Sequence, residues 1–225
     1  MAALYAVLTG DLVGSSDLAA NELDTLRQSL TEAVAKIRAW REGLVVGDVE
    51  FYRGDAWQLL ITDPKLFFRV ALFLRTTLRQ HRFWDTRMAI GLGQIEKIDD
   101  RQISLSIGEG FTLSGHKLDQ MGSAPGFRFD APDWLKPRTG WVEPVLDLCD
   151  QVIGRLKPRQ AATVCAALAP SAPPQREIAR DLGISQQGVS AALASAGWFA
   201  IEQTLRFAEA FDWQRGGGGS PDGPE

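Results

Sequence analysis

The stretch VEFYRGDAWQLL, residues 49–60, decides how the first half of this chain folds. Two apolar segments meet at Gly54-Asp55, and a Gly-Asp pair between such segments is typical of a tight β-hairpin turn. The turn predicts two paired strands at about residues 45–52 and 56–61. It leaves open whether Asp55 is only a turn residue or a carboxylate held out for an ion or a phosphate.

Strand-like and helix-like segments alternate on both sides of this hairpin. Residues 4–10 form a nearly continuous apolar run, which is typical of a buried central strand. From residue 21 to 40 apolar residues recur every three or four positions, which predicts an amphipathic helix. A second helix is expected to begin at Pro64, and RMAIGLGQI, residues 87–95, predicts another strand. A last helix is expected over residues 110–121.

This order predicts an α+β fold whose first half is a ferredoxin-like βαββαβ palm domain. In such a domain two crossover helices cover one face of an antiparallel sheet. The N-terminal strand and the hairpin strand then lie side by side at the centre of the sheet. Asp11 ends one of them and Asp55 stands at the turn, so we expect both carboxylates at one rim.

The composition changes after this half. Residues 124–141 are rich in Pro, Gly, Asp and Trp without a period, which predicts a connector. It separates the palm domain, residues 1–123, from an all-α domain, residues 142–213. Residues 214–225, which contain a GGGGS run, are expected to form a disordered tail.

Charge and cysteine content narrow the class of protein. A formal net charge of −4 argues against nucleic-acid binding through bulk positive charge. Cys149 and Cys165 have no CxxC spacing, so we expect reduced core residues without a disulfide framework or zinc cluster. The apolar N-terminal run ends at Gly10-Asp11, too early for a signal peptide, and no later run has transmembrane length. We therefore predict a cytoplasmic protein with no membrane partner.

Asp11 and the residues after it have the composition of a metal–phosphate site. LTGDLVGSSDL places a carboxylate at a strand end, followed by Gly14, Ser15 and Ser16. A carboxylate and the Leu12 carbonyl are hard oxygen donors for Mg²⁺, and free amides at a helix start can face phosphate oxygens. The alternative makes Asp11 a turn residue and the serines helix caps.

The second candidate metal ligand is Asp55. Two carboxylates at adjacent strand ends either repel each other or share a cation, and a bound Mg²⁺ or Mn²⁺ would explain both Asp11 and Asp55. The pair therefore favours a metal site more than either residue does alone.

Several motifs occur in a fixed order over residues 4–198: AVLTGDLVGSS, RGDAWQLL, MAIGLG, IGEGFTLSGHKLDQM and RLKPRQ…EIARDLGISQQGVS. In this order they resemble the SatD-like family, a bacterial group whose N-terminal half is similar to class III nucleotidyl cyclase and GGDEF-type palm domains. The resemblance implies Asp11 and Asp55 as catalytic metal ligands, ATP or GTP as the nucleotide, and a homodimer. It implies a carbonyl ligand to the metal from Leu12 and phosphate contacts from Gly14, Ser15 and Ser16, and it places Arg53 where many cyclases carry a base-recognising lysine. Thr112 is a polar residue of the last palm helix that could bind phosphate.

One family feature is missing from the last helix of the palm. Cyclases place an Asn and an Arg one turn apart there, to stabilise the transferring phosphoryl group. GFTLSGHKLDQ contains no Asn, and Lys117, near the arginine position, is a point charge where a bidentate fork is expected. The GGDEF signature is also absent. Nucleotide binding is therefore better supported than catalysis, in which Lys117 would be the third catalytic residue.

The C-terminal half carries a second motif. QREIARDLGISQQGVSAAL, residues 175–193, has helix-turn-helix spacing, with Gly183 in the turn and a serine capping the second helix. Gln side chains can read adenine edges in DNA. The predicted DNA contacts are Arg176, Arg180, Ser185, Gln186, Gln187 and Ser190. The second helix has no Lys or Arg, so the alternative is a trihelical module for dimerisation or protein contact.

These observations predict a nucleotide-responsive regulator. Its palm would bind a purine nucleoside triphosphate with Mg²⁺, with nucleotidyl transfer or cyclisation as an added activity, and its helix-turn-helix would bind DNA. The alternative is a DNA-binding transcription factor whose degenerate palm serves dimerisation or sensing without turnover, and a structural adaptor is a third interpretation. The orientation of Lys117 and Thr112 relative to Asp11 and Asp55 discriminates between these hypotheses.

Overall fold

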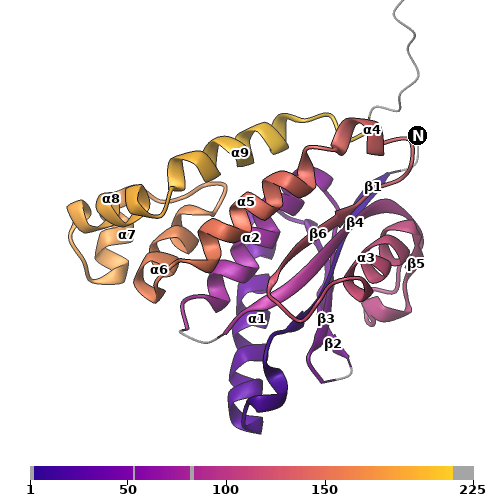
Figure 1. The fold of residues 1–225 in the computed structure, drawn as a ribbon, viewed down its shortest axis with the longest axis horizontal. Coiled ribbons are helices and arrows are strands. Elements are labelled where there is room, and N and C mark those ends of the chain that lie inside the picture. Colours follow the sequence, from indigo (N-terminus) through magenta and orange to yellow (C-terminus); the bar gives the residue numbers. More distant parts are fainter. Residues whose placement is uncertain (1–2, 53, 82–83, 215–225) are drawn as a thin grey trace, which may run out of the picture.

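The computed structural model describes residues 3–52, 54–81 and 84–214. Its centre is a twisted sheet with helices on both faces (Figure 1). The strands are β1 (Leu4–Leu12), β2 (Val45–Tyr52), β3 (Ala56–Ile61), β4 (Thr86–Lys97), β5 (Ile107–Gly108) and β6 (Gly126–Asp130). Strands β2, β3, β1 and β4 lie side by side in this order and are antiparallel. Strand β5 pairs with the far end of β4, and β6 pairs with β4 in parallel.

Nine α-helices follow or separate the described strands. They are α1 (Ala20–Trp40), α2 (Phe67–Leu78), α3 (Glu109–Asp119), α4 (Lys136–Thr139), α5 (Val142–Gly154), α6 (Pro158–Ala167), α7 (Gln175–Leu182), α8 (Gln186–Ser195) and α9 (Trp198–Ala210). Short 3₁₀ turns are η1 (Ser15–Asp17), η2 (Pro64–Leu66) and η3 (Ile103–Leu105). Within the described residues, no helix combines the length and the apolar character that crossing a membrane requires.

The order of elements from β1 to β4 is the predicted βαββαβ unit, with β1 and β3 at the centre of the sheet. Alternate residues of β1 face opposite sides, as the pleat requires. Leu8 points into the large core under α1 and α2, whereas Val7 lies in a smaller cluster on the other side, with Phe111 of α3 packed against it. The predicted α+β class with an antiparallel sheet is therefore confirmed.

Helix α3 lies unusually close to β4. A Cβ on Gly91 would stand 2.2 Å from the carbonyl oxygen of Gly110, and one on Gly93 would stand 2.3 Å from the amide nitrogen of Gly110. Only glycine permits this approach. A buried hydrogen bond of 2.8 Å between the hydroxyls of Thr9 and Ser114 then joins α3 to the centre of the sheet.

Helix α2 is covered on all sides. Every one of its residues except Thr77 is buried. One side of α2 lies on the sheet, and α5, α6 and α9 lie on the other (Figure 1). We call α5 to α9, residues 142–213, the helical half. Because α2 packs on both the sheet and the helical half, one hydrophobic core runs from Leu4 to Trp213.

The structure differs from the predicted connector over residues 124–141. This segment contains β6 and α4, and it adds to the sheet and the core instead of separating two domains. Phe127 and Phe129 alternate with the exposed Arg128, so both phenyl rings enter the core. Phe129 lies 5.4 Å from Phe67 between ring centroids. Of the predicted tail, residues 215–225 lie outside the described part of the chain.

Candidate functional site

The structure brings the ends of β1 and β3 together. Asp11 stands opposite Ala56 in the antiparallel register, and Asp55 directly precedes Ala56 at the hairpin turn. Asp11 and Asp55 therefore share one rim of the sheet. Arg27 of α1 fixes the turn, because its Nε donates a hydrogen bond of 3.0 Å to the carbonyl oxygen of Gly54.

Arg87 is the residue of this rim that sequence reasoning missed. It stands opposite Asp11 on β4, and its Nε and Nη2 donate to the two Asp11 carboxylate oxygens at 2.7 and 2.6 Å. Its Nη1 donates to the carbonyl oxygens of Met121 and Gly122, just after α3, at 2.7 and 2.8 Å. The hydrogen bond to Asp11 raises the pKa of Arg87, despite the opposing effect of burial. Arg87 thus holds a full positive charge within the rim.

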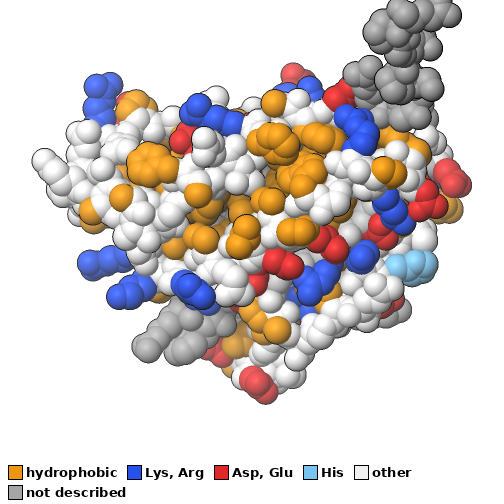
Figure 2. Space-filling view, turned by 45° about the horizontal axis from the view of Figure 1, so that its top comes forward, with side chains coloured by type: hydrophobic (Ala, Val, Ile, Leu, Met, Phe, Trp, Pro, Cys, Tyr) orange, Lys and Arg blue, Asp and Glu red, His pale blue; other side chains and the backbone are white. Residues whose placement is uncertain are grey.

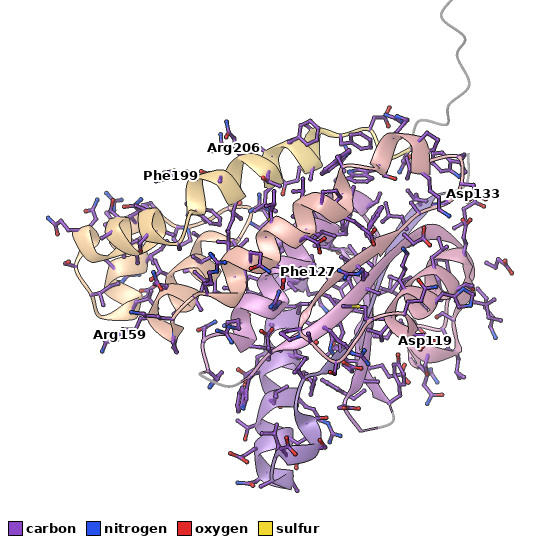
Figure 3. The ribbon with its side chains drawn as sticks, in the orientation of Figure 1. Asp119, Phe127, Asp133, Arg159, Phe199 and Arg206 are labelled. Carbon is purple, nitrogen blue, oxygen red and sulfur yellow. The ribbon has the colours of Figure 1, made fainter. Side chains whose placement is uncertain are left out.

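Two further carboxylates act on the same guanidinium. The charges of Asp55 and of Asp119, at the end of α3, add to the increase in the pKa of Arg87 (Figure 3). Asp11 thus contacts the guanidinium, and the charges of Asp55 and Asp119 act on it without a direct hydrogen bond.

Asp55 has a polar partner in the segment after β1. The hydroxyl of Ser15 donates a hydrogen bond to Asp55 Oδ2. Gly14 precedes η1 in the left-handed region, with φ 71°, which turns the chain back toward the hairpin. Ser16 is the middle residue of η1. Of the predicted phosphate-contacting residues Gly14, Ser15 and Ser16, the structure shows Ser15 in contact with Asp55, and all three follow Asp11 within five residues of the chain.

Hydrogen bonds with neighbouring segments fix the backbone of Asp11 at the end of β1. Thr86, opposite Leu12 in the register, donates its hydroxyl hydrogen to the carbonyl oxygen of Asp11. Trp57 Nε1 donates to the same hydroxyl at 3.1 Å. The Leu12 side chain is buried, and the amide of Val13 donates to the carbonyl oxygen of Asp85 at 3.0 Å. These bonds fix the position of the backbone that carries the Asp11 carboxylate.

Two predicted site residues lie elsewhere. Thr112 is exposed on α3, and its hydroxyl donates to the Gly108 carbonyl at the start of the same helix. Lys117 Nζ is 3.6 Å from Glu143 Oε1 of α5, on the side of α3 that faces the helical half. The structure does not bring either of them to Asp11 and Asp55, so their geometry gives no support to a role in phosphoryl transfer. Arg53 lies outside the described residues.

The donor set at the rim limits the kind of metal site. Across the described ranges, no group of three or more His, Cys, Asp or Glu side chains is placed to enclose a metal ion. Mg²⁺ is commonly held by one or two carboxylates together with substrate phosphates and water, rather than by a cage of protein ligands. As a pair of carboxylates without a third metal-binding side chain, Asp11 and Asp55 match the second arrangement and not the first.

The predicted helix-turn-helix segment forms two helices with a tight turn. Gly183 ends α7 in the left-handed region, with φ 63°. Ser185 caps α8 as predicted, because its Oγ accepts a hydrogen bond of 3.0 Å from the amide of Gly188. The hydroxyl of Ser185 is therefore already engaged. Gln186 and Gln187 are exposed at the start of α8.

The remaining predicted DNA contacts are also at the surface. Ser190 is exposed one turn further along α8. Arg176 and Arg180 have side chains 76% and 73% exposed, and each lies beside the carboxylate of the next residue in sequence, at 4.0 and 3.0 Å. Arg159 projects from α6 at the same end of the molecule (Figure 3). The positive charge near α8 thus comes from α6 and α7.

Three comparisons with known proteins complete this description. No protein-family model matches the chain. No curated protein matches it either. Among solved structures, the crystal structure of the guanylyl cyclase Cya2 is similar with a TM-score of 0.37 and 15% sequence identity, over 56% of this chain and 77% of that chain. A similarity of this size does not define the function.

Proposed function

We propose that this protein is a nucleotide-responsive regulator that binds a nucleoside triphosphate together with Mg²⁺ at the rim of Asp11, Asp55 and Arg87. The observation that carries the proposal is the charge arrangement. The carboxylates of Asp11 and Asp55, which a divalent cation would need, share the rim with the guanidinium of Arg87, which now pairs with Asp11 and would pair with phosphate once a cation takes Asp11. A magnesium–triphosphate complex supplies both charges at once.

Each partner of the rim has a role in this proposal. Mg²⁺, when bound, would take oxygen ligands from Asp11 and Asp55 and neutralise charge on the phosphates. Arg87 offers a planar fork of donors, which suits phosphate oxygens as well as it suits the carboxylate of Asp11. Ser15 now bonds to Asp55 and would orient that carboxylate toward the ion. The resemblance to the SatD-like family favours ATP or GTP.

Binding without turnover is the form of the proposal that the geometry supports best. Lys117 is paired with Glu143, and Thr112 bonds within its own helix. Neither side chain is therefore placed to stabilise the charge of a phosphoryl group transferred at Asp11 and Asp55. Cyclisation or nucleotidyl transfer remains a prediction from the sequence.

In the proposal the helical half binds DNA through α8. Gln186 and Gln187 at the exposed start of α8 have the amide groups that can pair with adenine edges in the major groove. Arg176 and Arg180 would contact backbone phosphates. The affinity of this helix for DNA should be modest, because α8 has no basic residue and phosphate contacts supply much of the binding free energy. A complex that is strongly salt-dependent and of modest affinity is expected.

Isothermal titration calorimetry tests the rim. ATP and GTP are titrated with Mg²⁺, with Mn²⁺ and with EDTA, and Mg²⁺ is also titrated alone. We expect binding only when nucleotide and metal are both present, and a loss of at least ~10-fold in Asp55→Asn and Asp11→Asn, since a charged hydrogen-bonding or metal-ligating group contributes ~1.5–3 kcal/mol. Asp48→Asn on β2 is the matched control, because Asp48 is an exposed carboxylate away from the rim.

Absence of nucleotide binding in the unaltered protein would refute the rim site. Equal affinity in Asp55→Asn and Asp48→Asn would place any binding elsewhere. Product analysis by chromatography after incubation with Mg²⁺ or Mn²⁺ tests turnover separately. For the helical half, a mobility-shift titration at several salt concentrations should show weaker binding in the double variant Gln186→Ala, Arg180→Ala. Unchanged binding in this variant would exclude α8 as the reading element.

A further inference from the structure

A hollow of about 550 Å³ lies between the chain that follows α3 and helix α5. One wall comes from residues 121–128 and the other from residues 144–151. Small-molecule sites are usually clefts or cavities of ~300–1,000 Å³. The roles proposed for the rim and for α8 do not use this hollow, so we ask which ligand it would fit.

The hollow combines apolar walls with a few polar groups, which is the usual composition of a ligand site. Leu148 of α5 is 67% exposed, more than any other large apolar side chain of the described chain, and it lines the hollow together with Pro125 and Pro144. Figure 2 shows apolar side chains beside acidic and basic ones on the side of the molecule where α5 lies. A flat ring bound in the hollow would remove these apolar side chains from water.

One ion pair in the hollow has unused hydrogen-bonding positions. Arg128 Nη1 donates to Asp147 Oδ1 at 3.2 Å and to the carbonyl oxygen of Phe127 at 2.6 Å. Because both bonds come from Nη1, Nε and Nη2 of Arg128 and Oδ2 of Asp147 have no hydrogen-bond partner among the described residues. The side chains of Arg128 and Asp147 are 46% and 61% exposed. The pair therefore offers a ligand donors and an acceptor side by side.

Adenine has an edge that complements this pair. Its N6 amino group is a donor and the adjacent N7 is an acceptor, so N6 suits the carboxylate of Asp147 and N7 suits the guanidinium of Arg128. The same edge of guanine has two acceptors, N7 and O6, and the carboxylate would repel one of them. The hydrogen-bonding pattern of the hollow therefore favours adenine over guanine.

The hollow and the rim share a wall. Met121 and Gly122 line the hollow, and their carbonyl oxygens accept hydrogen bonds of 2.7 and 2.8 Å from Arg87 Nη1. Gly126, also in the lining, stands opposite Arg87 on β4, and Arg87 stands opposite Asp11 on β1. Because neighbouring strands are ~4.8 Å apart, Gly126 is two such spacings, ~10 Å, from Asp11. A ribose and an α-phosphate can join a base in the hollow to phosphates at the rim over this distance.

We propose that this hollow binds the adenine base of a nucleotide whose phosphates lie at the rim, with N6 on Asp147 and N7 on Arg128. The inference rests on the proposed function and narrows its ligand to ATP. Gly122 lies where the nucleotide passes from the rim to the hollow. It is exposed, and a Cβ at this position would have open space around it, so the passage is not blocked.

Isothermal titration calorimetry with Mg²⁺ and four ligands tests this base site: ATP, GTP, 7-deaza-ATP, which lacks N7, and inorganic tripolyphosphate, which lacks base and ribose. ATP should bind at least ~5-fold more tightly than each of the other three, since a matched pair of base contacts discriminates by at least that factor. Asp147→Ala and Arg128→Ala should remove this advantage and leave the affinity for tripolyphosphate unchanged. The matched control is Glu202→Ala, which breaks an exposed ion pair with Arg206 on α9.

A steric block tests the passage between rim and hollow. Gly122→Leu should weaken ATP binding at least ~5-fold, because the leucine would crowd the ribose, and should leave tripolyphosphate binding unchanged. Gly115→Leu on α3 is the matched control, since a Cβ there also has open space around it.

The outcomes separate this inference from the proposed function. If neither ATP nor tripolyphosphate binds, the rim site is refuted and the base site falls with it. If tripolyphosphate binds and ATP binds no more tightly, the rim stands and the hollow is not a base site. GTP binding as tight as that of ATP, or an unchanged ATP affinity in both Asp147→Ala and Gly122→Leu, would also overturn the inference while leaving the rim intact.

Discussion

The buried ion cluster between α2, β4 and α5 gives the sharpest prediction for stability. Arg75 is 2% exposed; its Nε and Nη2 donate to the two oxygens of Asp85 at 2.7 and 3.1 Å, and its Nη1 donates to Asp150 of α5. Burial alone would lower the pKa of Arg75, but the bonds and charges of Asp85 and Asp150 outweigh it, so the pKa is raised. The arginine is therefore charged and depends on both carboxylates.

We expect Asp85→Asn to lower the free energy of unfolding by ~3–5 kcal/mol. Removing one partner of a buried pair leaves a charge with too little compensation, and this range is typical of such a change. The change also removes negative charge from an oxygen that accepts from the Thr86 amide at 2.9 Å. With a urea m-value of ~2–3 kcal/mol/M, the midpoint of unfolding should fall by ~1–2.5 M. Tryptophan fluorescence in a urea titration measures it.

The control for this measurement is Asp48→Asn. Asp48 pairs with Arg38, but both side chains are exposed, at 73% and 45%. Exposed pairs contribute ~0–1 kcal/mol, so the midpoint should hardly move. If Asp85→Asn moved the midpoint no more than Asp48→Asn does, the cluster would not be a significant source of stability and the reasoning would be wrong.

Three further predictions concern packing, pH and thiol chemistry. Gly91→Ala should destabilise the fold by ~1–3 kcal/mol in urea titrations, because its Cβ would stand 2.2 Å from a backbone oxygen of α3, whereas Gly115→Ala, with open space around it, should not. Partial desolvation at the surface lowers the pKa of His81 below its ordinary value of 6.5. The stability that neutral His81 contributes is therefore fully present above pH ~6.5 and is lost as the pH falls through the lowered pKa of His81. His81→Gln should abolish this loss, and a variant with the same pH profile of stability would contradict the prediction. Burial raises the pKa of Cys149 to about 12 and of Cys165 to about 11, so neither should react with Ellman's reagent near pH 8 until urea unfolds the chain; rapid reaction of the folded chain would show that these thiols are accessible.

The sequence contained enough to place Asp11 beside Asp55, because hairpin and strand patterns fix which strands are neighbours. It did not reveal Arg87. The RMAIGLGQI segment was expected to be a strand, but which residue of β4 faces Asp11 depends on the register between β1 and β4. The register follows from packing across the whole sheet, and a shift by one residue would turn Arg87 to the other face. The alternation of side chains along β4 assigns Arg87 to one face of the sheet, but only the register with β1 places it opposite Asp11.

The division into separate domains also failed to anticipate the packing, for a reason visible in α2. The segment after Pro64 is apolar on nearly all sides, which is typical of a helix enclosed by the protein. A helix that only covers one face of a sheet would have an exposed polar side. The burial of nearly all of α2 thus required a second layer, which the helical half supplies. In residues 124–141, the alternation of Phe127, Arg128 and Phe129 was the signal of β6, hidden among Pro and Gly residues.

The rim geometry has one consequence for how the proposed ligand would bind. A divalent cation that arrived alone would have to compete with Arg87 for Asp11, and the displaced guanidinium would remain next to a second positive charge. A triphosphate that arrived alone would be repelled by the carboxylates of Asp11 and Asp55 beside Arg87. Binding of the cation alone and binding of the triphosphate alone are both unfavourable. The triphosphate would pair with the displaced guanidinium, and the cation would neutralise the carboxylates that repel the triphosphate. Under the proposed function, metal and nucleotide therefore bind with positive coupling, which must be equal in both directions. Replacing Arg87 with Gln removes the competitor and the anion partner together, so it should strengthen binding of the metal alone and weaken binding of the complex.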